Sequence, residues 1–350
     1  MSDTGSASAG SSSGGLRRYL LVRLALAPLF LFVILTVLFV LLRVAPGDPV
    51  TASLGGRASP AQIERAREAS GLNDPLIKQY VDYLSGVVRG DFGDPYTDPR
   101  SVTEIIGDRF PATVELTSFA MVLAVVVGVL VGSRSARKRD GPFDVFGRFF
   151  GVITYAAPVF WLGILAQLVF SVKLGWLPTG NRVSADIPVG DLDTTGYYLI
   201  DAIIHRDWPF FVDAFEHLIL PGVTLGLVIS GVFIRMVRVN MLQTLRSDYV
   251  ESARARGVNE RHVVYRHAFR NALIPVVTIM GLQFSLLLGG AVLTETTFSW
   301  PGLGSALVDF LNARDYAAVQ GIVTFFAVIV IVVSLAIDII NGLIDPRVRY

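Results

Sequence analysis

The hydrophobic residues of the chain gather in long blocks that are separated by polar or charged stretches. No residue from Leu24 to Leu42 is charged, and at ~1.5 Å per residue this block is long enough to cross a ~30 Å hydrocarbon core as a helix. Later blocks are mostly apolar and are bounded by charge, glycine or proline. The pattern predicts an all-α polytopic membrane protein with six transmembrane helices. They are expected near residues 24–42, 112–133, 149–172, 217–239, 273–294 and 318–344.

The same pattern divides the chain into parts. The first residues are mostly Ser, Gly and Ala, which cannot bury apolar surface, so a disordered tail is expected there. Arg43-Val44-Ala45-Pro46 is a poor cleavage site, which favours an uncleaved helix over a signal peptide. The predicted parts are a disordered tail at 1–16, a first transmembrane helix at 17–44, a small external helical segment at 45–111, and a five-helix transmembrane core at 112–350 with a cytoplasmic loop at 240–272.

Basic residues predict the orientation in the membrane. The connector from Arg134 to Arg148 is basic, and so is the arginine-rich stretch from Arg235 to Arg270. Positively charged connectors stay on the cytoplasmic side, whereas the segments at 45–111 and 173–216 hold more acidic than basic residues. We therefore expect both the N-terminus and the C-terminus, which carries Arg347 and Arg349, to lie in the cytoplasm.

The external segment carries signals for two helices. Ser59 and Gln62 have the spacing of a capping box, with Pro60 at the first helical position and Gly71 suited to the stop. A second helix is expected from Asp74-Pro75 to Gly90, with an apolar stripe at helical spacing. We expect this pair to pack on the outer mouth of the bundle. The mixed signs of its polar face disfavour the alternative, a membrane-surface helix.

Composition supports the membrane assignment and excludes several kinds of chemistry. The chain is 52% hydrophobic and 17% charged, and its mean hydropathy of +0.56 exceeds the globular range. There is no cysteine, hence no disulfide, thiolate metal site or cysteine nucleophile. No P-loop motif and no zinc-protease motif occurs, and His262 and His267 are not spaced to share one metal ion. We expect no catalytic residue, no bound cofactor, no metal site and no nucleic-acid partner.

The loop between the fourth and fifth predicted spans is the most informative segment. Asp248 and Glu251 have capping-box spacing, which predicts a short helix that begins at Tyr249 and ends near Gly257. Tyr249, Ala253 and Gly257 follow at i, i+4 and i+8, a face small enough for another backbone to approach. Such a helix suits a docking element for a soluble partner. The alternative is a plain connecting loop whose arginines only enforce orientation.

This loop resembles the EAA-type loop of binding-protein-dependent ABC importer permeases, in which a coupling helix inserts into a groove on the ATP-binding subunit. The resemblance lies in Glu251-Ser252-Ala253, Gly257 and the stretch from Asn271 to Pro275, with Ser252 in place of the usual second alanine. Further strings resemble the first permease subunit of the dipeptide, oligopeptide and nickel importer group. They are Pro46-Gly-Asp-Pro49, Gly90-Asp-Phe-Gly93, Arg109-Phe-Pro-Ala-Thr-Val-Glu-Leu116 and Thr294-Glu-Thr-Thr-Phe-Ser-Trp-Pro-Gly-Leu-Gly304.

The resemblance implies a transport subunit, not an enzyme, in a prokaryotic plasma (inner) membrane. Its implied partners are a second homologous permease subunit, two ATP-binding subunits, and an extracytoplasmic solute-binding protein that delivers peptides or nickel. Tyr249, Glu251, Ala253 and Gly257 would then form the coupling helix. Glu251 would contact the ATPase, although a capping role alone also explains it.

Polar residues inside the spans are costly and are therefore candidates for the translocation path. Gln167, Gln283 and Glu295 are the three that we single out, although an interhelical hydrogen bond explains a lone glutamine equally well. Two rival functions stay open from the residues alone. An ATP-independent secondary carrier would favour internal repeats and deep charges, and a membrane-embedded hydrolase would need a catalytic constellation that the sequence does not show.

Overall fold

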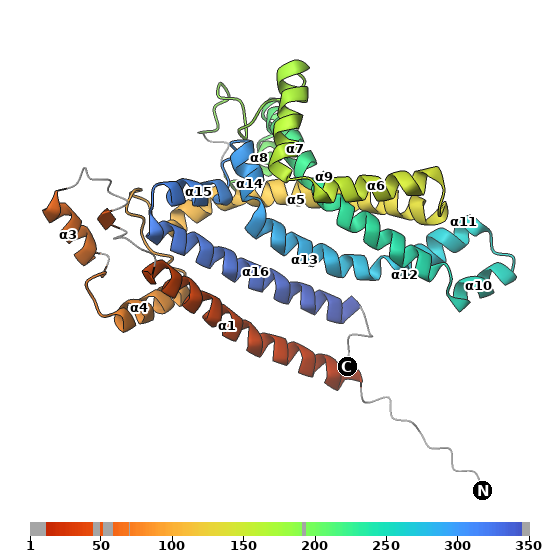
Figure 1. The fold of residues 1–350 in the computed structure, drawn as a ribbon, viewed down its shortest axis with the longest axis horizontal. Coiled ribbons are helices and arrows are strands. Elements are labelled where there is room, and N and C mark those ends of the chain that lie inside the picture. Colours follow the sequence, from red (N-terminus) through yellow and green to blue (C-terminus); the bar gives the residue numbers. More distant parts are fainter. Residues whose placement is uncertain (1–11, 45–49, 52–58, 70, 191–193, 345–350) are drawn as a thin grey trace, which may run out of the picture.

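The computed structural model describes residues 12–44, 50–51, 59–69, 71–190 and 194–344. Within these ranges all regular secondary structure is helical. The helices lie mostly along one long axis, with α10 (Asp248–Ala255) and α11 (Glu260–His262) near one end of the molecule and α3 (Pro60–Ala69) and α4 (Leu76–Arg89) near the other (Figure 1). The predicted all-α polytopic fold is confirmed.

Five helices are long and apolar enough to cross a membrane, and a bent pair gives a sixth candidate. The bent pair is α6 (Pro142–Ala156) followed by α7 (Val159–Ala166) and the π-helix η1 (Gln167–Lys173), with an angle of 102° at the break. The other spans lie in α1 (Ser12–Val44), α5 (Val102–Arg137), α9 (Trp208–Thr244), α12 (Phe269–Ala272) continuing into α13 (Ile274–Gly290), and α16 (Tyr316–Ile344).

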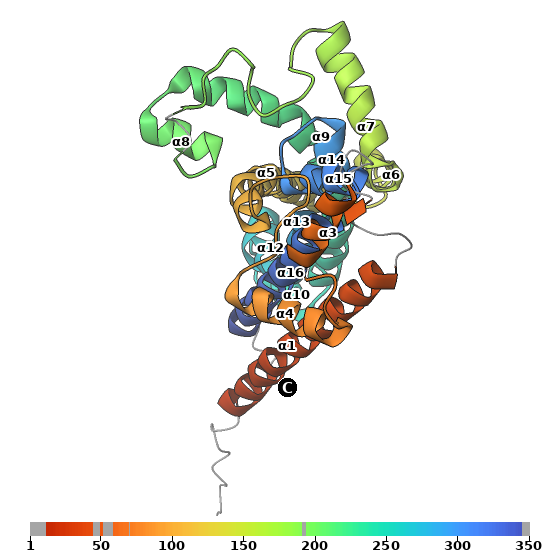
Figure 2. The same cartoon turned by 90° about the vertical axis from the view of Figure 1, so that its left-hand side faces the viewer.

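Helices α5 and α9 form the centre of the bundle. Gly128 on α5 faces Phe233 on α9, and a Cβ at Gly128 would overlap the Cβ of Phe233. In the apolar window of α9 67% of the residues are buried, against 11% in α1. Close contact at this glycine therefore makes α9 the core helix, while α1 lies at the edge of the bundle against α16 (Figure 2).

Several spans begin earlier or end later than the hydrophobic blocks predict. The second begins at Val102, because Ser101 and Glu104 form a capping box that sequence reasoning missed. The fourth begins at Trp208 with Asp207 as its cap. The helices thus extend past the apolar blocks, since polar caps satisfy their first N–H groups outside the hydrocarbon.

The third predicted span, at 149–172, is not one straight helix. It breaks where Pro158 follows Ala157, whose backbone is extended. Proline disfavours the helical conformation of the residue before it, so the break falls at this point. As a result α7 stands across the bundle direction (Figure 1).

The helices predicted in the external segment are present. The backbone N–H of Gln62 donates to Ser59 Oγ at 3.3 Å and that of Ser59 to Gln62 Oε1 at 2.7 Å, so the capping box is confirmed. Gly90 ends α4 in the left-handed conformation. Helix α4 packs through its tyrosines, because the Tyr83 hydroxyl lies 2.6 Å from Thr324 Oγ1 on α16 and the Tyr80 hydroxyl 2.6 Å from Thr36 Oγ1 on α1.

The ends of the chain bear on two predictions. Most of the tail expected at 1–16 lies outside the described residues, and residues 12–16 belong to α1. The C-terminal arginines at 347 and 349 lie outside the described residues. The cytoplasmic orientation of both termini stays a prediction.

Candidate functional site

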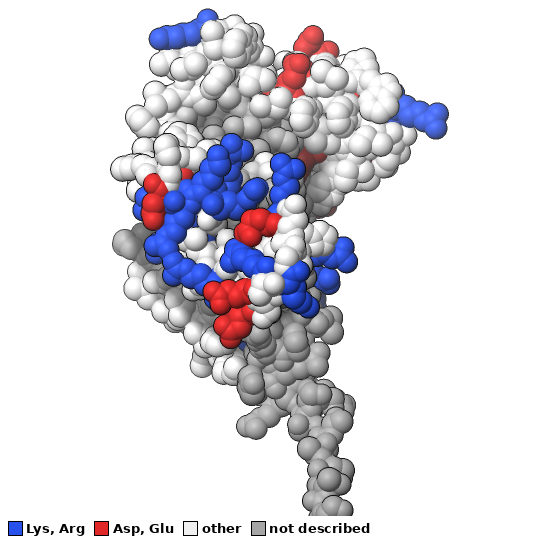
Figure 3. Space-filling view, turned by 90° about the vertical axis from the view of Figure 1, so that its right-hand side faces the viewer, with Lys and Arg blue, Asp and Glu red and all other residues white. Residues whose placement is uncertain are grey.

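The segment between α9 and α13 folds into short helices at one end of the bundle. Helix α10 is followed by α11, by the π-helix η3 (Val263–Ala268) and by α12. Figure 3 shows this end of the molecule, where lysine and arginine side chains predominate. The segment therefore forms an ordered, basic platform and not an open loop.

Helix α10 begins one residue earlier than predicted, and its cap is different. Ser247 is the N-cap, but its hydroxyl donates to the Thr244 carbonyl at 2.6 Å and makes no capping bond. Asp248 and Glu251 both lie in the first turn of α10, where their charges interact favourably with the helix dipole. The capping box predicted from Asp248 and Glu251 is thus wrong, because Asp248 is already helical.

One side of α10 is packed into the chain itself. Val250 and Ala253 are fully buried in a cluster that includes Val263, Val264 and Ala268. A small residue at 253 lets α10 lie close to η3. The expectation that Ala253 shares an exposed face with Tyr249 and Gly257 is therefore corrected, since its methyl group faces the chain's own helices.

The other side of α10 is open. The Tyr249 side chain is 43% exposed, and Glu251 and Ser252 are also exposed. Gly257 ends the helix with φ +75°, and nothing lies within 4 Å of the position that a Cβ would occupy there. Its predicted role as a helix stop is confirmed, while the surrounding space leaves room for a partner.

Two sets of side-chain hydrogen bonds hold α10 on the bundle. Asn271 Nδ2 donates to the Tyr249 hydroxyl oxygen at 2.9 Å, which links α10 to α12. Arg254 donates from Nε and Nη2 to the two carboxylate oxygens of Glu260 at 3.1 and 2.8 Å, and from Nη1 to the Leu245 carbonyl at 3.1 Å. The Arg254 guanidinium lowers the pKa of Glu260. The exposed face of α10 is thus held in a fixed position relative to α9 and α12.

The next short helix, α11, has a side-chain cap. Asn259 Oδ1 accepts a hydrogen bond from the Arg261 N–H at 2.9 Å. The helix that it starts turns into η3 and α12 and leads into α13.

The three candidates for the translocation path lie in different surroundings. Gln167 Nε2 donates to the carbonyls of Thr179 at 2.7 Å and Thr297 at 3.1 Å, so its amide fastens η1 to neighbouring segments. Gln283 is half-buried on α13. Within the described ranges its side chain makes no hydrogen bond. No hydrogen bond joins either glutamine to Glu295 among the described residues, although Gln167 contacts Thr297 at the end of the helix that carries Glu295.

Glu295 is completely buried in α14 (Val292–Thr297). Its carboxylate accepts hydrogen bonds from Thr113 Oγ1 at 2.6 Å and from the Ser305 N–H at 2.8 Å. A Cβ at Gly304 would lie 2.9 Å from Glu295 Oε2, so the glycine makes room for the carboxylate. Glu295 thereby joins α5, α14 and α15 (Leu303–Asn312) at one buried point.

Two buried ion pairs were not predicted. Arg182 Nη2 lies 2.7 Å from Glu115 Oε2, with side-chain exposures of 5% and 8%, and fastens the segment before α8 (Tyr198–His205) to α5. Arg238 Nη2 on α9 donates to Asp144 Oδ2 on α6 at 2.8 Å. The sequence offers one signal for these ion pairs, which is the cost of placing a charge inside a span. This cost marks Glu115 as unusual, but it does not reveal a partner that is distant in the sequence.

A helical bundle with up to six candidate spans and an ordered basic platform at one end is the architecture of a polytopic membrane protein. Residues 119–350 match the family described as "Binding-protein-dependent transport system inner membrane component". Residues 16–117 match the one described as "Binding-prot-dependent transport system membrane comp, N-term". The chain belongs to this family, whose description confirms the predicted inner-membrane location.

Curated relatives support the assignment along most of the chain. The chain is 40% identical to the dipeptide transport system permease protein DppB of Escherichia coli (strain K12), over 95% of this chain and 99% of the relative. It is 40% identical to the DppB protein of Alkalihalophilus pseudofirmus, over 90% and 94%. It is 38% identical to the glutathione transport system permease protein GsiC of Pectobacterium atrosepticum, over 91% and 95%. The chain is accordingly a permease subunit and not an enzyme, as its sequence predicts.

Proposed function

We propose that the chain is the permease subunit of an ATP-driven peptide importer and that α10 receives an ATP-binding subunit. The observation that carries this proposal is the division of α10 into two sides. Val250 and Ala253 pack into the bundle, whereas Tyr249 and Glu251 are exposed. A helix that is buried on one side and exposed on the other can contact a soluble partner and transmit its movement to the spans.

The proposed complex contains a second homologous permease, two ATP-binding subunits and an extracytoplasmic solute-binding protein. In this arrangement the α10 platform and both termini face the cytoplasm, and α3 and α4 face outward. The basic character of the platform supports this orientation. The apolar surface of α7 supports a second permease, because Trp161 is 51% and Ile164 53% exposed in the single chain, and a helix that is apolar on all sides is normally covered.

Peptides are the proposed solute class, because the relatives bear the names of dipeptide and glutathione transport permeases. The relatives described above are named for dipeptide and glutathione transport and not for nickel, so nickel is the weaker alternative. Gln283 is the proposed path residue with an available amide. Gln167 and Glu295 are already hydrogen-bonded within the chain. They are proposed to support the path indirectly, by holding neighbouring helices together.

The test is uptake of a labelled dipeptide into proteoliposomes that hold the complete complex, with ATP supplied on the side of the ATP-binding subunits. We expect uptake to require ATP and to continue without an ion gradient. Glu251→Lys should abolish it, whereas Glu68→Lys, the same charge change on an exposed residue of α3, should leave it unchanged. Uptake driven by an ion gradient without ATP would establish a secondary carrier instead.

A further inference from the structure

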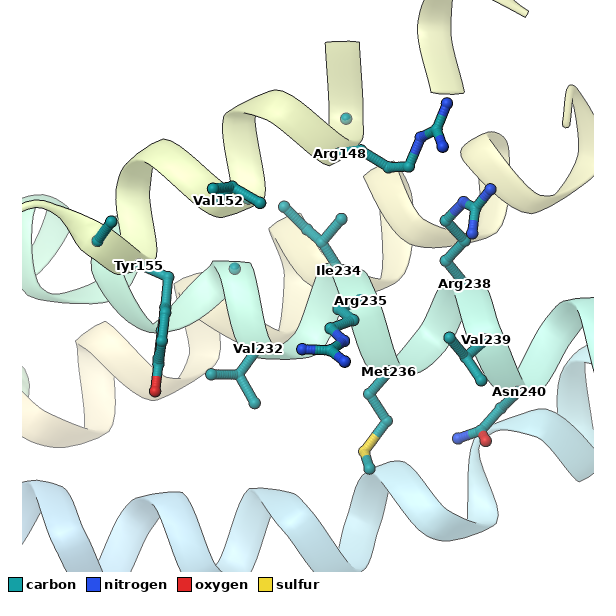
Figure 4. Close-up of a pocket in the computed structure, with 14 residues that line it drawn as sticks. Arg148, Val152, Tyr155, Val232, Ile234, Arg235, Met236, Arg238, Val239 and Asn240 are labelled. Carbon is teal, nitrogen blue, oxygen red and sulfur yellow. The ribbon is translucent and has the colours of Figure 1, made fainter. Parts of the chain in front are cut away.

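A groove of about 760 Å³ runs along the side of the α6 and α9 pair (Figure 4). The two helices touch at Gly151 and Gly231, where a Cβ on Gly231 would overlap the carbonyl oxygen of Gly151. Beside this contact the groove has mostly apolar walls, which include Val152, Tyr155 and Val232, and Arg235 also lines it. The two glycines let the helix backbones lie in close contact, and the groove runs beside this contact.

The groove continues into a second hollow of about 400 Å³, which shares Arg148, Arg238 and Val239 with it. We call this second hollow the arginine basin. Unlike the groove it is lined largely by charged residues, and Figure 3 shows lysine and arginine side chains gathered at this end of the molecule. Its charged lining residues are Arg139, Asp140, Arg148, Arg238 and Arg246.

The carboxylates near the arginine basin neutralise only part of its charge. Asp144 pairs with Arg238 and lies 4.0 Å from Arg148, and Asp140 pairs with Arg139 at 3.2 Å. Four lining arginines against two aspartates leave an excess of two positive charges. Arg246 has no carboxylate within ion-pair distance in the part of the chain that the structure describes. The basin is therefore suited to an anion.

The position of the two hollows suits one leaflet of a bilayer. Arg148 directly precedes the apolar block at 149–172 and Arg238 lies at the end of the block at 217–239. Both arginines therefore fall near the boundary of the hydrocarbon, where lipid headgroups lie. From Arg148 the groove follows α6 to Ala156, a further ~12 Å into the hydrocarbon.

We propose that the groove and the arginine basin together bind one phospholipid with an anionic headgroup. The headgroup phosphate contacts Arg148 and Arg246, and an acyl chain lies along Val152, Tyr155 and Val232. Basic pockets between transmembrane helices on the cytoplasmic side are the kind of site that holds such headgroups. A protein helix would fill the apolar groove without satisfying the arginines, and free phosphate would satisfy the arginines without covering the groove.

The proposed site rests on the proposed function only for its placement in the inner leaflet. If the lipid does not bind, the proposal of ATP-driven uptake still stands. If uptake proves independent of ATP, the groove and the arginine basin can still bind the lipid. The two proposals can therefore fail separately.

The test is native mass spectrometry of the complete complex equilibrated with equal amounts of phosphatidylglycerol and phosphatidylcholine. We expect the wild type to retain phosphatidylglycerol in preference. Arg148→Gln with Arg246→Gln should lower its affinity for phosphatidylglycerol about 30-fold, the effect expected from removing two basic residues near a membrane surface. Val152→Trp, which fills the groove at a 65% exposed position, should prevent retention of either lipid.

The matched control is Arg261→Gln with Arg266→Gln, which removes the same charge from exposed residues outside the groove and should retain the lipid. Equal lipid retention by the two double variants would overturn the proposal. Displacement of phosphatidylglycerol by millimolar inorganic phosphate would show that the basin takes a free anion. A cross-link from a photoreactive group at Val152 to a second permease would show that protein fills the groove.

Discussion

The Tyr249 hydroxyl oxygen accepts a hydrogen bond from Asn271 Nδ2 at 2.9 Å, and this contact joins α10 to the helix that continues into the fifth span. The contact ties α10 directly to α12, which leads into α13. Helix α10 is attached at its other end by Arg254 and Glu260. In the proposed function these contacts transmit movement of the ATP-binding subunits to the spans.

Tyr249→Phe removes the hydroxyl and keeps the ring that faces a partner. One hydrogen bond contributes ~1 kcal/mol, or about fivefold in an equilibrium constant. We expect the ATP-binding subunit to co-purify normally while dipeptide uptake per ATP hydrolysed falls several-fold. Asn271→Ala should do the same, and the double variant should be no worse than either single variant. Additive losses would show that the two residues act independently.

Gly257→Asn and Gly257→Val separate two roles of this glycine, which are to end α10 at a positive φ and to leave room for a partner subunit. At φ +75° asparagine is tolerated but a β-branched residue is strained. We expect Val to increase hydrogen exchange in α10 and to reduce docking, whereas Asn keeps the turn. Binding of the ATP-binding subunit, measured by co-purification, then distinguishes the roles. If the Asn variant keeps its exchange protection but loses the subunit, the position contacts the partner directly.

Glu295→Ala should destabilise the protein, because it leaves Thr113 Oγ1 and the Ser305 N–H without their buried acceptor. Each unsatisfied buried group costs ~1–3 kcal/mol, so the Tm of the purified complex should fall by several degrees. Glu295→Gln keeps the shape and one of the two acceptor oxygens, so the Tm should fall less than in the Ala variant and the dipeptide KM should be preserved. A raised KM with an unchanged Tm would indicate contact with the solute.

The segment before α5 should loosen in acid. Hydrogen bonds from Arg100 hold the pKa of Asp98 at about 2, below its ordinary value of 3.8. A lowered carboxyl pKa stabilises the folded segment above the ordinary value, and this stabilisation is lost as the pH falls through about 2. Hydrogen exchange at 94–101, corrected for the intrinsic rate, should thus show less protection at pH 2 than at pH 5. Asp98→Asn should remove the pH dependence, and an unchanged profile in that variant would refute the assignment.

Most of the apolar spans and the helices of the external segment could be predicted because the sequence signals are local. The apolar blocks, the Ser59–Gln62 capping box and Gly90 each determine nearby structure without help from distant residues. The α10 helix was located for the same reason.

The rest depended on tertiary contacts. Helical spacing placed Ala253 with Tyr249, but only the position of η3 decides which side of α10 is buried. The partners Arg182 and Glu115 lie 67 residues apart, and no periodicity links them. Glu295 illustrates the same limit, since a carboxyl group near a span end suggests a path residue until Thr113 and Ser305 are found around it.

The most direct test of α10 as the coupling helix is a cross-link from its exposed side. The chain contains no cysteine, so Glu251→Cys and Glu68→Cys each introduce a single thiol that can carry a benzophenone cross-linker in the purified complex. We predict that the probe at 251 cross-links to an ATP-binding subunit and that the probe at 68 does not. Failure of the 251 probe to reach that subunit, in a complex that still imports dipeptide with ATP, would contradict the assignment of α10 as the coupling helix.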